Sequence, residues 1–215
     1  MNGTSNTNNS DGIWVIGAGG HAKVVIDTLR ASGRTIAGVL DSDQTKHGSK
    51  VLGETVIAPF DFDLLDRLRV HRAVIAIGDN KARKHIAQQL QGIVWETIIH
   101  PFSYVSATAE VGAGALVCAG VVVQPNTRIG EHSILNTGSS IDHDCVVGRW
   151  THVAPGTRLA GGVSLGEGVL AGIGSAILPN LSIGDWTIIG AGAVVISDTP
   201  SEVRTTGVPA SWLPK

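Results

Sequence analysis

A six-residue repeat runs from Val105 almost to the C-terminus and constrains the fold more than any other feature of this 215-residue chain. Every sixth residue is apolar, and the column reads Val105, Val111, Val117, Val123, Ile129, Leu135, Ile141, Val147, Val153, Leu159, Leu165, Ala171, Ile177, Ile183, Ile189 and Val195. Two positions earlier stands a second column of mostly small or β-branched residues: Ser103, Ala109, Ala115, Val121, Thr127, Ser133, Ser139, Cys145, Thr151, Thr157, Val163, Val169, Ser175, Leu181, Thr187 and Ala193. This spacing fits no helical period and is typical of short strands separated by turns, with both columns on one inner face.

The hexads predict a coil of defined geometry, because hexapeptide repeats are the signature of a parallel β-helix. Glycines 18 residues apart each follow an apolar column member: Gly112, Gly130, Gly148, Gly166 and Gly184. We therefore predict that three hexads form one turn of a triangular prism, with these glycines in a positive-φ conformation at one corner. Asn136 and Asp142 are expected to adopt that conformation at other corners. Each coil buries its inner face only by stacking on the next.

The residues ahead of the repeat alternate between strand and helix patterns. We expect strands at 13–16, 36–40, 73–77 and 94–99, helices at 23–31, 62–68 and 81–90, and a glycine-rich turn at 17–22. This alternation predicts a small Rossmann-like α/β domain with a parallel sheet. The expected organisation is a disordered tail over 1–11, the α/β domain over 12–100, an all-β domain that forms the parallel β-helix over 101–198, and a C-terminal tail over 199–215.

Composition and charge narrow the class of partner. A net charge of −2 argues against nucleic acid or an anionic membrane and leaves small molecules and protein partners. No apolar run is long enough to span a bilayer, and the first ten residues lack the basic and apolar regions of a signal peptide. Cys118 and Cys145 have neither disulfide-framework nor zinc-knuckle spacing, which favours a cytoplasmic protein.

A phosphate-binding fingerprint lies at the start of the α/β domain. Gly17-x-Gly19-x-x-Ala22 matches GxGxxG/A, and Asp41 ends the next predicted strand. Such turns bring backbone N–H groups and a helix N-terminus close to a phosphate. The motif alone is weak, since the glycines are equally explained by a tight turn. The short domain suits a nucleotide or a nucleotide sugar better than a dinucleotide.

Four segments carry a family resemblance, and they are GAGGHAKVV at 17–25, AIGDN at 76–80, NTGSSIDHDCVVG at 136–148 and GVPA at 207–210. The chain resembles the bacterial left-handed β-helix sugar acetyltransferases grouped with sialic acid O-acetyltransferases and bacillosamine N-acetyltransferase, and within them the perosamine N-acetyltransferases. The resemblance implies a homotrimer that uses acetyl-CoA, without a metal, and has its active site between adjacent β-helices. It implies as acceptor a nucleotide-linked 4-amino-4,6-dideoxy sugar like GDP-perosamine, used in O-antigen (lipopolysaccharide) or other glycan synthesis.

His143 is the candidate general base for this reaction. A thioester is already activated, so acyl transfer to an amine needs a base but no covalent intermediate, and histidine suits that task near neutral pH. His143 lies two positions after inward Ile141, which places it at an outward corner, and Asp144 follows directly. The resemblance assigns the family's catalytic histidine and its acidic neighbour to this pair, although the bacillosamine enzyme has Glu where this chain has Asp144. The alternative is a solvated corner histidine.

The resemblance also assigns positions to the two substrates. For acetyl-CoA these are His152, Gly172, Ile173, Gly190 and Ala191. For the nucleotide they are Gly19, Gly20, His21, Asp41, Ser42 and Gly78, all of which follow predicted parallel strands, where open α/β sheets bind ligands. His152 could equally be a surface or interface histidine, His21 could cap its own turn, and the glycines could serve only coil packing. The basic helix 81–84, with Arg83, is expected to be a solvated face.

Other functions remain open at this stage. A sugar O-acetyltransferase would use the same residues. A zinc enzyme resembling the trimeric β-helical carbonic anhydrases, which bind zinc through histidines shared across a subunit interface, would draw on His132, His143 and His152, since three histidines suit that chemistry. A non-catalytic binding or scaffold protein would keep the pocket without turnover. A nicotinamide dehydrogenase is disfavoured, because the β-helix stands where a substrate domain would be.

Overall fold

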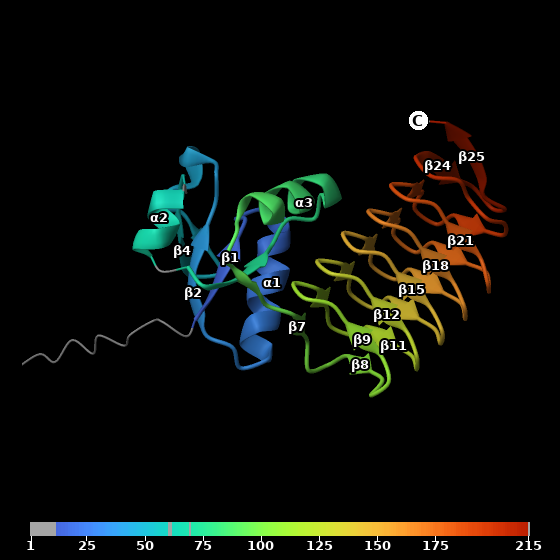
Figure 1. Ribbon diagram of the computed structural model, residues 1–215, viewed down its shortest axis with the longest axis horizontal. Helices are drawn as coiled ribbons and strands as arrows, with labels where there is room; N and C mark the ends of the chain where they lie inside the picture. Colours follow the sequence, from blue (N-terminus) through green and yellow to red (C-terminus); the bar gives the residue numbers. More distant parts are fainter. Residues whose placement is uncertain (1–11, 60–61, 69, 215) are drawn as a thin grey trace, which may run out of the picture.

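The computed structural model describes residues 12–59, 62–68 and 70–214, and Figure 1 shows an open α/β domain followed by a long stack of coils. It confirms the predicted fold class, a Rossmann-like parallel sheet followed by a left-handed parallel β-helix. The tail predicted over residues 1–11 lies outside the described residues. Within the described part of the chain, no helix has the length and apolarity needed to cross a bilayer.

The N-terminal sheet has the strand order β3-β4-β2-β1-β5-β6. Its strands are β1 (Ile13–Ile16), β2 (Ile36–Leu40), β3 (Lys50–Val51), β4 (Glu54–Ile57), β5 (Arg72–Ile75) and β6 (Val94–Trp95). Only β3 and β4 pair in antiparallel fashion. This hairpin occupies residues for which the sequence analysis predicted no strand. Its turn places Leu52 at φ 47° and Gly53 at φ 89°, and leucine is not a residue that signals such a turn.

Helices cover both faces of this sheet. They are α1 (Gly20–Ala31), α2 (Phe62–Arg67) and α3 (Asn80–Gln89), with a short 3₁₀ helix η2 (Gln44–Lys46) after β2. The buried apolar side chains of α1 pack in one hydrophobic cluster, whereas Leu65 of α2 and the partly buried Ile86 of α3 pack in another on the opposite face. α1 begins at Gly20 rather than Lys23, because Gly19 serves as an extended N-cap with φ −85°. His21 therefore belongs to the first turn of the helix.

The β-helix consists of two-residue strands arranged on three faces. Face 1 comprises β7 (Ile98–Ile99), β10 (Leu116–Val117), β13 (Ile134–Leu135), β16 (His152–Val153), β19 (Leu170–Ala171), β22 (Ile188–Ile189) and β24 (Val203–Thr206), with β25 (Ser211–Pro214) antiparallel to β24. Face 2 comprises β8 (Tyr104–Val105), β11 (Val122–Val123), β14 (Ser140–Ile141), β17 (Arg158–Leu159), β20 (Ala176–Ile177) and β23 (Val194–Val195). Face 3 comprises β9 (Glu110–Val111), β12 (Arg128–Ile129), β15 (Val146–Val147), β18 (Ser164–Leu165) and β21 (Ser182–Ile183). We call the edges between faces the 1–2, 2–3 and 3–1 corners.

The two columns read from the sequence form the interior of the prism. Val123, Leu135 and Ile141 of the apolar column have no exposed surface, and neither do Thr127 and Cys145 of the small column. Each strand pairs in parallel with the strand 18 residues further on, so every inward residue stacks on its counterpart in the next coil. The prediction of three hexads per turn is confirmed.

The predicted role of the glycine column is wrong. Gly112, Gly130, Gly148, Gly166 and Gly184 do not have positive φ, and neither do Asn136 and Asp142. The left-handed residues come two positions after the glycines, at every sixth position from Gly114 to Gly192. The glycine column is needed for a different reason: a Cβ on Gly112 would lie 2.7 Å from the backbone nitrogen of Glu131 in the next coil. Adjacent coils approach too closely there for any side chain.

Two boundaries differ from the expectation. The strand predicted over 94–99 is divided, because β6 ends the α/β sheet and β7 already pairs with β10 on face 1. Residues 199–215, expected as a tail, include β24 and β25, which close the last coil. Each break falls where the chain changes from one sheet to another, and short apolar runs carry no signal for that change.

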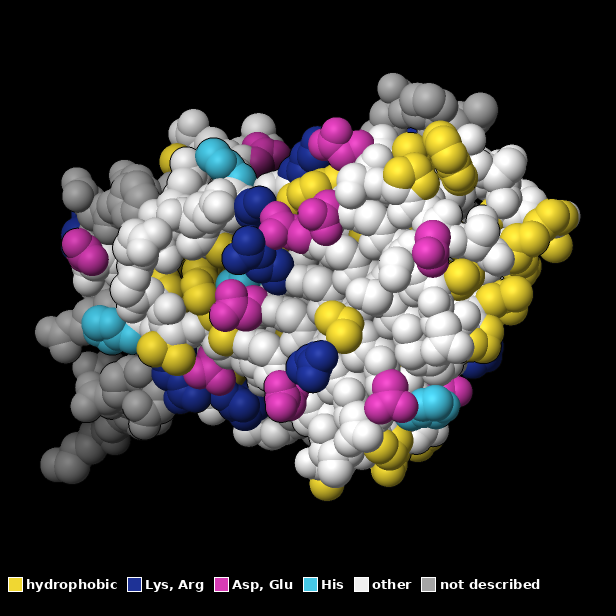
Figure 2. Space-filling model, turned by 45° about the vertical axis from the view of Figure 1, so that its right-hand side comes forward, with side chains coloured by type: hydrophobic (Ala, Val, Ile, Leu, Met, Phe, Trp, Pro, Cys, Tyr) yellow, Lys and Arg dark blue, Asp and Glu magenta, His cyan; other side chains and the backbone are white. Residues whose placement is uncertain are grey.

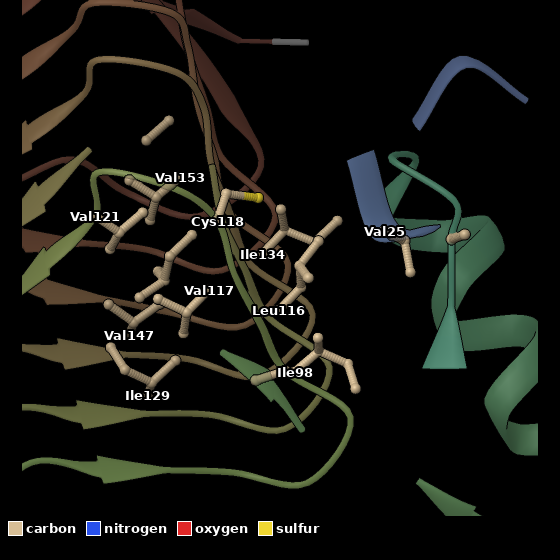
Figure 3. Packing of buried hydrophobic residues seen from close by; sticks show 14 of the residues in the cluster. Val25, Ile98, Leu116, Val117, Cys118, Val121, Ile129, Ile134, Val147 and Val153 are labelled. Carbon is tan, nitrogen blue, oxygen red and sulfur yellow. The ribbon is translucent and has the colours of Figure 1, made fainter. Parts of the chain in front are cut away.

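The outward side of face 1 attaches the α/β domain. Its outward residues in the first coils, Ile98, Leu116 and Ile134, are at most 2% exposed. Figure 3 shows these three side chains projecting from the coils toward the side where Val25 of α1 lies, while Val117 and Val153 point into the prism. One continuous apolar cluster thus joins α1 to the β-helix interior. An apolar outward column spaced by 18 residues is the sequence signal for this docking face.

The glycine correction predicts a contrast between two substitutions. In Gly130→Ala the new Cβ meets the backbone of Arg149 in the next coil, which cannot move without breaking the coil register. We expect a loss of roughly 1–3 kcal/mol in unfolding free energy. Gly138→Asn is the control, because Gly138 has φ 66° with open space around it and asparagine tolerates that conformation. Thermal unfolding should show a clear drop in melting temperature for Gly130→Ala only. Equal melting temperatures for the two variants would contradict the packing argument.

Candidate active site

His143 and Asp144 form a hydrogen-bonded pair at the 2–3 corner, where the chain passes from β14 to β15. The Nδ1 atom of His143 lies 2.8 Å from Oδ2 of Asp144, and the two side chains are 60% and 58% exposed. Asp144 has φ 59°, a left-handed conformation that aspartate tolerates better than most residues. Aspartate is shorter than the glutamate of the bacillosamine enzyme, but the Asp144 carboxylate still reaches the imidazole, because the corner backbone turns it toward His143.

Neighbouring groups fix the position and charge of His143. Its backbone N–H donates to Oδ1 of Asp142 at 2.7 Å, and its carbonyl accepts from Gly162 at 2.9 Å. A Cβ on Gly161 would lie 2.7 Å from the imidazole ring, so any larger residue there would displace the ring from this position. The hydrogen bond to Asp144 and the charge of Asp142 raise the pKa of His143 above its usual value. The ring is thus a strengthened base that faces solvent.

The glycine-rich loop of the α/β domain lies at the carboxyl end of β1, next to that of β5. The strand order reverses direction between these two strands, and such switch points are where open α/β sheets bind ligands. Side chains added at Gly19 or Gly20 would meet nothing within 4 Å, so the start of α1 is open to an incoming group. Gly78 follows β5 at the same edge. The geometry suits the phosphates of a nucleotide.

Asp41 organises this edge. Its Oδ2 atom accepts from the backbone of Ala18 at 2.7 Å and from Nζ of Lys46 at 2.9 Å, and Oδ1 accepts from the backbone of Asp43 at 2.8 Å. Burial raises the pKa of Asp41, but these hydrogen bonds, led by that of Lys46, outweigh it and leave the pKa below its usual value. The carboxylate therefore ties the glycine loop to the loop after β2. Ser42, the next residue, is exposed.

His21 and His152 meet where the two domains touch. Their ring centroids are 6.3 Å apart. His152 lies 3.1 Å from Nδ2 of Asn136 through Nε2 and 3.3 Å from the carbonyl of Gly78 through Nδ1, while the buried Nε2 of His21 has no hydrogen-bond partner. Burial and the nearby Arg83 lower the pKa of both histidines to about 4. Both rings are neutral at pH 7.

Asn136 is a member of this cluster that the sequence analysis did not assign to the site. It stands at the 1–2 corner, seven residues before His143, and its Oδ1 also accepts from the backbone of Thr137 at 2.8 Å. The sequence carried one signal for it, the 18-residue spacing, which puts Asn136 and His152 in adjacent coils around face 1. His152 is a polar residue between apolar neighbours in the outward column of face 1, and Asn136 is its hydrogen-bond partner.

Arg83 on α3 is the centre of the contact between domains, and the expected solvated face is wrong for this residue. The side chain is 1% exposed. Its Nε donates to the carbonyl of His132 at 2.7 Å, Nη2 to the carbonyl of Trp150 and to Oδ1 of Asn80, each at 2.8 Å, and Nη1 to the carbonyl of Ile77 at 3.0 Å. Burial lowers the pKa of Arg83 to about 10, so it stays charged at neutral pH. Arg83 thus joins the edge of β5 to two coils of the β-helix.

The carbonyls of His132 and Trp150 that accept from Arg83 belong to the 3–1 corner, and other residues of α3 contact this corner as well. Lys84 pairs with Glu167 at 2.5 Å, and Arg149 pairs with the other oxygen of Glu167 at 2.7 Å. Asn80 donates to the carbonyl of Gly168 at 3.0 Å. On the face drawn in Figure 2, acidic and basic side chains lie intermixed rather than in one patch of a single sign. This corner therefore serves domain attachment, and its charges offset one another.

A small cleft remains between α3 and face 1. Its volume is about 140 Å³, and it is lined by Gly78, Asp79, Asn80, Lys81, Gly168, Leu170, Trp186 and Ile188. One wall is polar and comes from the N-terminus of α3, and the other is apolar and comes from the coils. The cleft opens beside Gly78, at the edge that carries the glycine loop.

The residues expected at acetyl-CoA lie along the 1–2 corner, with His152 as the exception. Ile173 is 62% exposed, and Ala191 occupies the equivalent exposed position one coil later. Gly172 and Gly190 precede them and contact the following coil closely. This corner carries a glycine with positive φ in each coil, at 120, 138, 156, 174 and 192, so one position in each of these coils has no side chain. His152 instead points toward Gly78 and Asn136 at the domain junction.

One chain does not bring all these residues together. The glycine loop and Gly78 lie over face 1, whereas His143 stands at the 2–3 corner, the corner opposite face 1 in a triangular prism. The three histidines of the zinc hypothesis are divided among the 3–1 corner, the 2–3 corner and face 1, and no cluster of three metal-binding side chains occurs in the described part of the chain. Within the described part of one chain, these histidines form no common site, and His143 stands apart from the edge that carries the glycine loop.

Comparisons with known proteins match two parts of the chain to different family models. Residues 12–90 match the family model described as PglD N-terminal domain, and residues 162–197 match that described as bacterial transferase hexapeptide (six repeats). A curated relative, GDP-perosamine N-acetyltransferase of Escherichia coli O157:H7, is 31% identical over 150 residues, which are 67% of each chain.

Solved structures resemble the whole chain. One is perosamine N-acetyltransferase from Caulobacter crescentus in complex with CoA and GDP-perosamine, a variant in which one histidine is replaced by asparagine. It is 41% identical, the match covers 95% of this chain and 97% of that one, and the TM-score is 0.89. Another is the acetyltransferase domain of PglB from Neisseria gonorrhoeae in complex with acetyl coenzyme A, at 33% identity, 94% and 99% coverage and a TM-score of 0.86.

Loss of the Arg83 hydrogen bonds should separate the domains. In Arg83→Met the carbonyls of His132 and Trp150 lose their donor while the stem of the side chain is kept. Leaving such buried acceptors unpaired costs about 1–3 kcal/mol each, so we expect the unfolding free energy of Arg83→Met to fall by several kcal/mol. Urea unfolding followed by tryptophan fluorescence measures it, with Lys81→Met, an exposed position on the same helix, as the control. Coincident urea unfolding curves for the two variants would contradict the role of Arg83 in holding the two domains together.

His132 should make stability depend on pH. The ring is 4% exposed and stacks on Trp150 with centroids 4.4 Å apart, and burial followed by Arg83 lowers its pKa to about 4. Because the unfolded chain binds a proton at about pH 6.5 and the folded chain only near 4, this histidine costs stability as pH falls through that window, by up to about 1.4 kcal/mol per pH unit. Urea titrations at pH 7, 6 and 5 should show a shallower slope for His132→Phe than for wild type. Parallel slopes would show that His132 protonates equally in both states.

Proposed function

Because the chain belongs to the family of hexapeptide-repeat sugar N-acetyltransferases that join a PglD-type N-terminal domain to a left-handed β-helix, we propose that it transfers the acetyl group of acetyl-CoA to the amino group of a nucleotide-linked amino sugar. The observation that carries this proposal is the exposed His143–Asp144 pair, with its 2.8 Å hydrogen bond, at a corner of the prism. It supplies the base that the reaction needs.

The reaction proceeds by direct attack. The sugar amine forms a bond to the thioester carbonyl carbon, the C–S bond breaks, and CoA leaves as the thiolate. The amine loses one proton to Nε2 of His143, because Nδ1 is engaged with Asp144. The carboxylate then stabilises the imidazolium that forms, and the proton passes on to the thiolate, which leaves the enzyme as free thiol. No covalent acetyl-enzyme is required.

The α/β domain supports a nucleotide as the handle of the acceptor. The open start of α1 at Gly19, Gly20 and His21 accommodates a diphosphate, and Gly78 lies at the adjoining strand end. Asp41 holds the loop through the backbone of Ala18, and Ser42 is exposed beside it. Given that relatives are named for GDP-perosamine, the proposed acceptor is a GDP-linked 4-amino-4,6-dideoxy sugar. Such a product serves surface polysaccharide (O-antigen) synthesis in the cytoplasm.

A homotrimer completes the site in this proposal. His143 and the nucleotide-binding edge stand on opposite sides of one prism, so the acceptor amine reaches a base only from a neighbouring chain. The exposed 1–2 corner offers acetyl-CoA the apolar side chains of Ile173 and Ala191 beside glycines that have no side chain. His152 then acts through the junction, where it holds Asn136 and Gly78 in place.

Replacing the base tests the proposal. His143→Asn should lower kcat by about 10²- to 10⁴-fold, the usual contribution of a general base, with little change in KM. Release of CoA thiol with a nucleotide amino sugar measures it, and His85→Asn, an exposed histidine on α3, is the control. Since the pKa of His143 is raised, wild-type kcat should fall with decreasing pH from a midpoint above 6.5. Near-wild-type turnover of His143→Asn would remove this residue from the role.

The acceptor class is tested separately, with a panel of GDP-, UDP- and CMP-linked amino sugars beside free amino sugars and their hydroxyl analogues. We expect acetylation of a GDP-linked 4-amino sugar at the nitrogen, located by mass spectrometry of the product. Acetylation of a hydroxyl would make the protein an O-acetyltransferase. Acetylation of free sugars but of no nucleotide sugar would remove the α/β domain from substrate binding.

A further inference from the structure

We infer that Asn126 is a positioning residue for the reaction, which orients the Asp144 carboxylate toward His143 from the coil before it. This inference rests on the proposed function of the His143–Asp144 pair. Asn126 occupies the 2–3 corner 18 residues before Asp144, in the same left-handed conformation, with φ 60° against 59°. Its Nδ2 atom donates to Oδ1 of Asp144 at 3.3 Å.

The two oxygens of Asp144 are thereby divided between two partners. Oδ2 faces Nδ1 of His143 at 2.8 Å, and Oδ1 receives the amide of Asn126. A carboxylate on an exposed corner otherwise rotates freely about its last torsion, and a second donor removes that freedom. The coil register supports the contact, because the backbone N–H of Asp144 donates to the carbonyl of Pro125 at 3.1 Å, directly before Asn126.

Asn126 is itself held in place. Its backbone N–H donates to Oγ1 of Thr108 at 3.0 Å, one coil further toward the N-terminus. A series of hydrogen bonds therefore runs along this corner over three coils, from the Thr108 hydroxyl through the backbone and side chain of Asn126 and the carboxylate of Asp144 to the imidazole of His143. The charged groups that face His143 are Asp142 and Asp144, and hydrogen bonds from His143 and then Asn126 keep the pKa of Asp144 below its usual value.

The same corner offers a matched control. Asn180 has φ 61° two coils beyond Asp144 and borders Gly162 rather than the catalytic pair. Asn126→Gly and Asn180→Gly both keep a residue that accepts positive φ, so both chains should fold with similar melting temperatures. Only the first removes the donor to Asp144. Asn126→Asp keeps the shape of the side chain but cannot donate.

Two measurements are needed, one of them independent of turnover. Asn126→Gly and Asn126→Asp should each lower kcat by about 3- to 10-fold, the effect of one exposed hydrogen bond to a charged group, with KM for both substrates within about twofold. NMR titration of the substrate-free protein, with the His143 signal identified by its loss in His143→Asn, should show a midpoint for Asn126→Gly lower by about 0.3–1 pH unit. Asn180→Gly should match wild type in both.

The possible failures are distinguishable. Wild-type kcat and an unshifted His143 midpoint in Asn126→Gly, with His143→Asn inactive, would overturn the role of Asn126 and leave the proposed function standing. An equal loss of kcat in Asn180→Gly would also overturn the role of Asn126, because it would show that either substitution loosens the corner as a whole. Full activity of Asn126→Asp would show that donation to Asp144 is not what matters. An active His143→Asn would instead overturn the proposed function itself.

Discussion

The rest of the structure depends on the 18-residue turn of the β-helix, because each coil buries its inner columns only against the next. The backbone approach at Gly112 and its equivalents leaves no room for a shift between coils. With the register fixed, each outward position acquires a set function. Face 1 presents Ile98, Leu116 and Ile134 to the α/β domain, the 1–2 corner carries one positive-φ glycine in each of its later coils, and the 2–3 corner presents His143 and Asp144.

A second constraint, the buried guanidinium of Arg83, sets the α/β domain on this scaffold. Its acceptors at the 3–1 corner include the carbonyls of His132 and Trp150, which have φ 54° and 63°. Positive φ is costly for aromatic residues, and the hydrogen bonds from Arg83 together with the stacking of the two rings help to stabilise it. The same guanidinium donates to the carbonyl of Ile77, at the edge that we propose binds the nucleotide. That edge is thereby held at a fixed distance from the coils.

The sequence predicted the fold well wherever a pattern repeats and poorly wherever a single contact decides. Sixteen apolar positions in phase determine the coil, and His143 follows from its offset to Ile141. The conformation of Gly130 could not be read in the same way, because glycine serves both positive φ and close packing. The burial of Arg83 and the contact of His152 with Gly78 join residues 49 to 74 positions apart, and a basic stretch in the sequence does not reveal which of its members turns inward.

The central claim is that the base and the nucleotide-binding edge of one active site come from different chains. Co-expression of His143→Asn with Gly19→Glu tests it most directly, since the glutamate points into open space and its charge repels a diphosphate without disturbing the fold. Each variant alone should be nearly inactive. Mixed oligomers from equal amounts should recover about a quarter of the wild-type activity, because that fraction of shared sites combines two intact halves. Mixed oligomers as inactive as either variant would show that each site lies within one chain and would contradict the account.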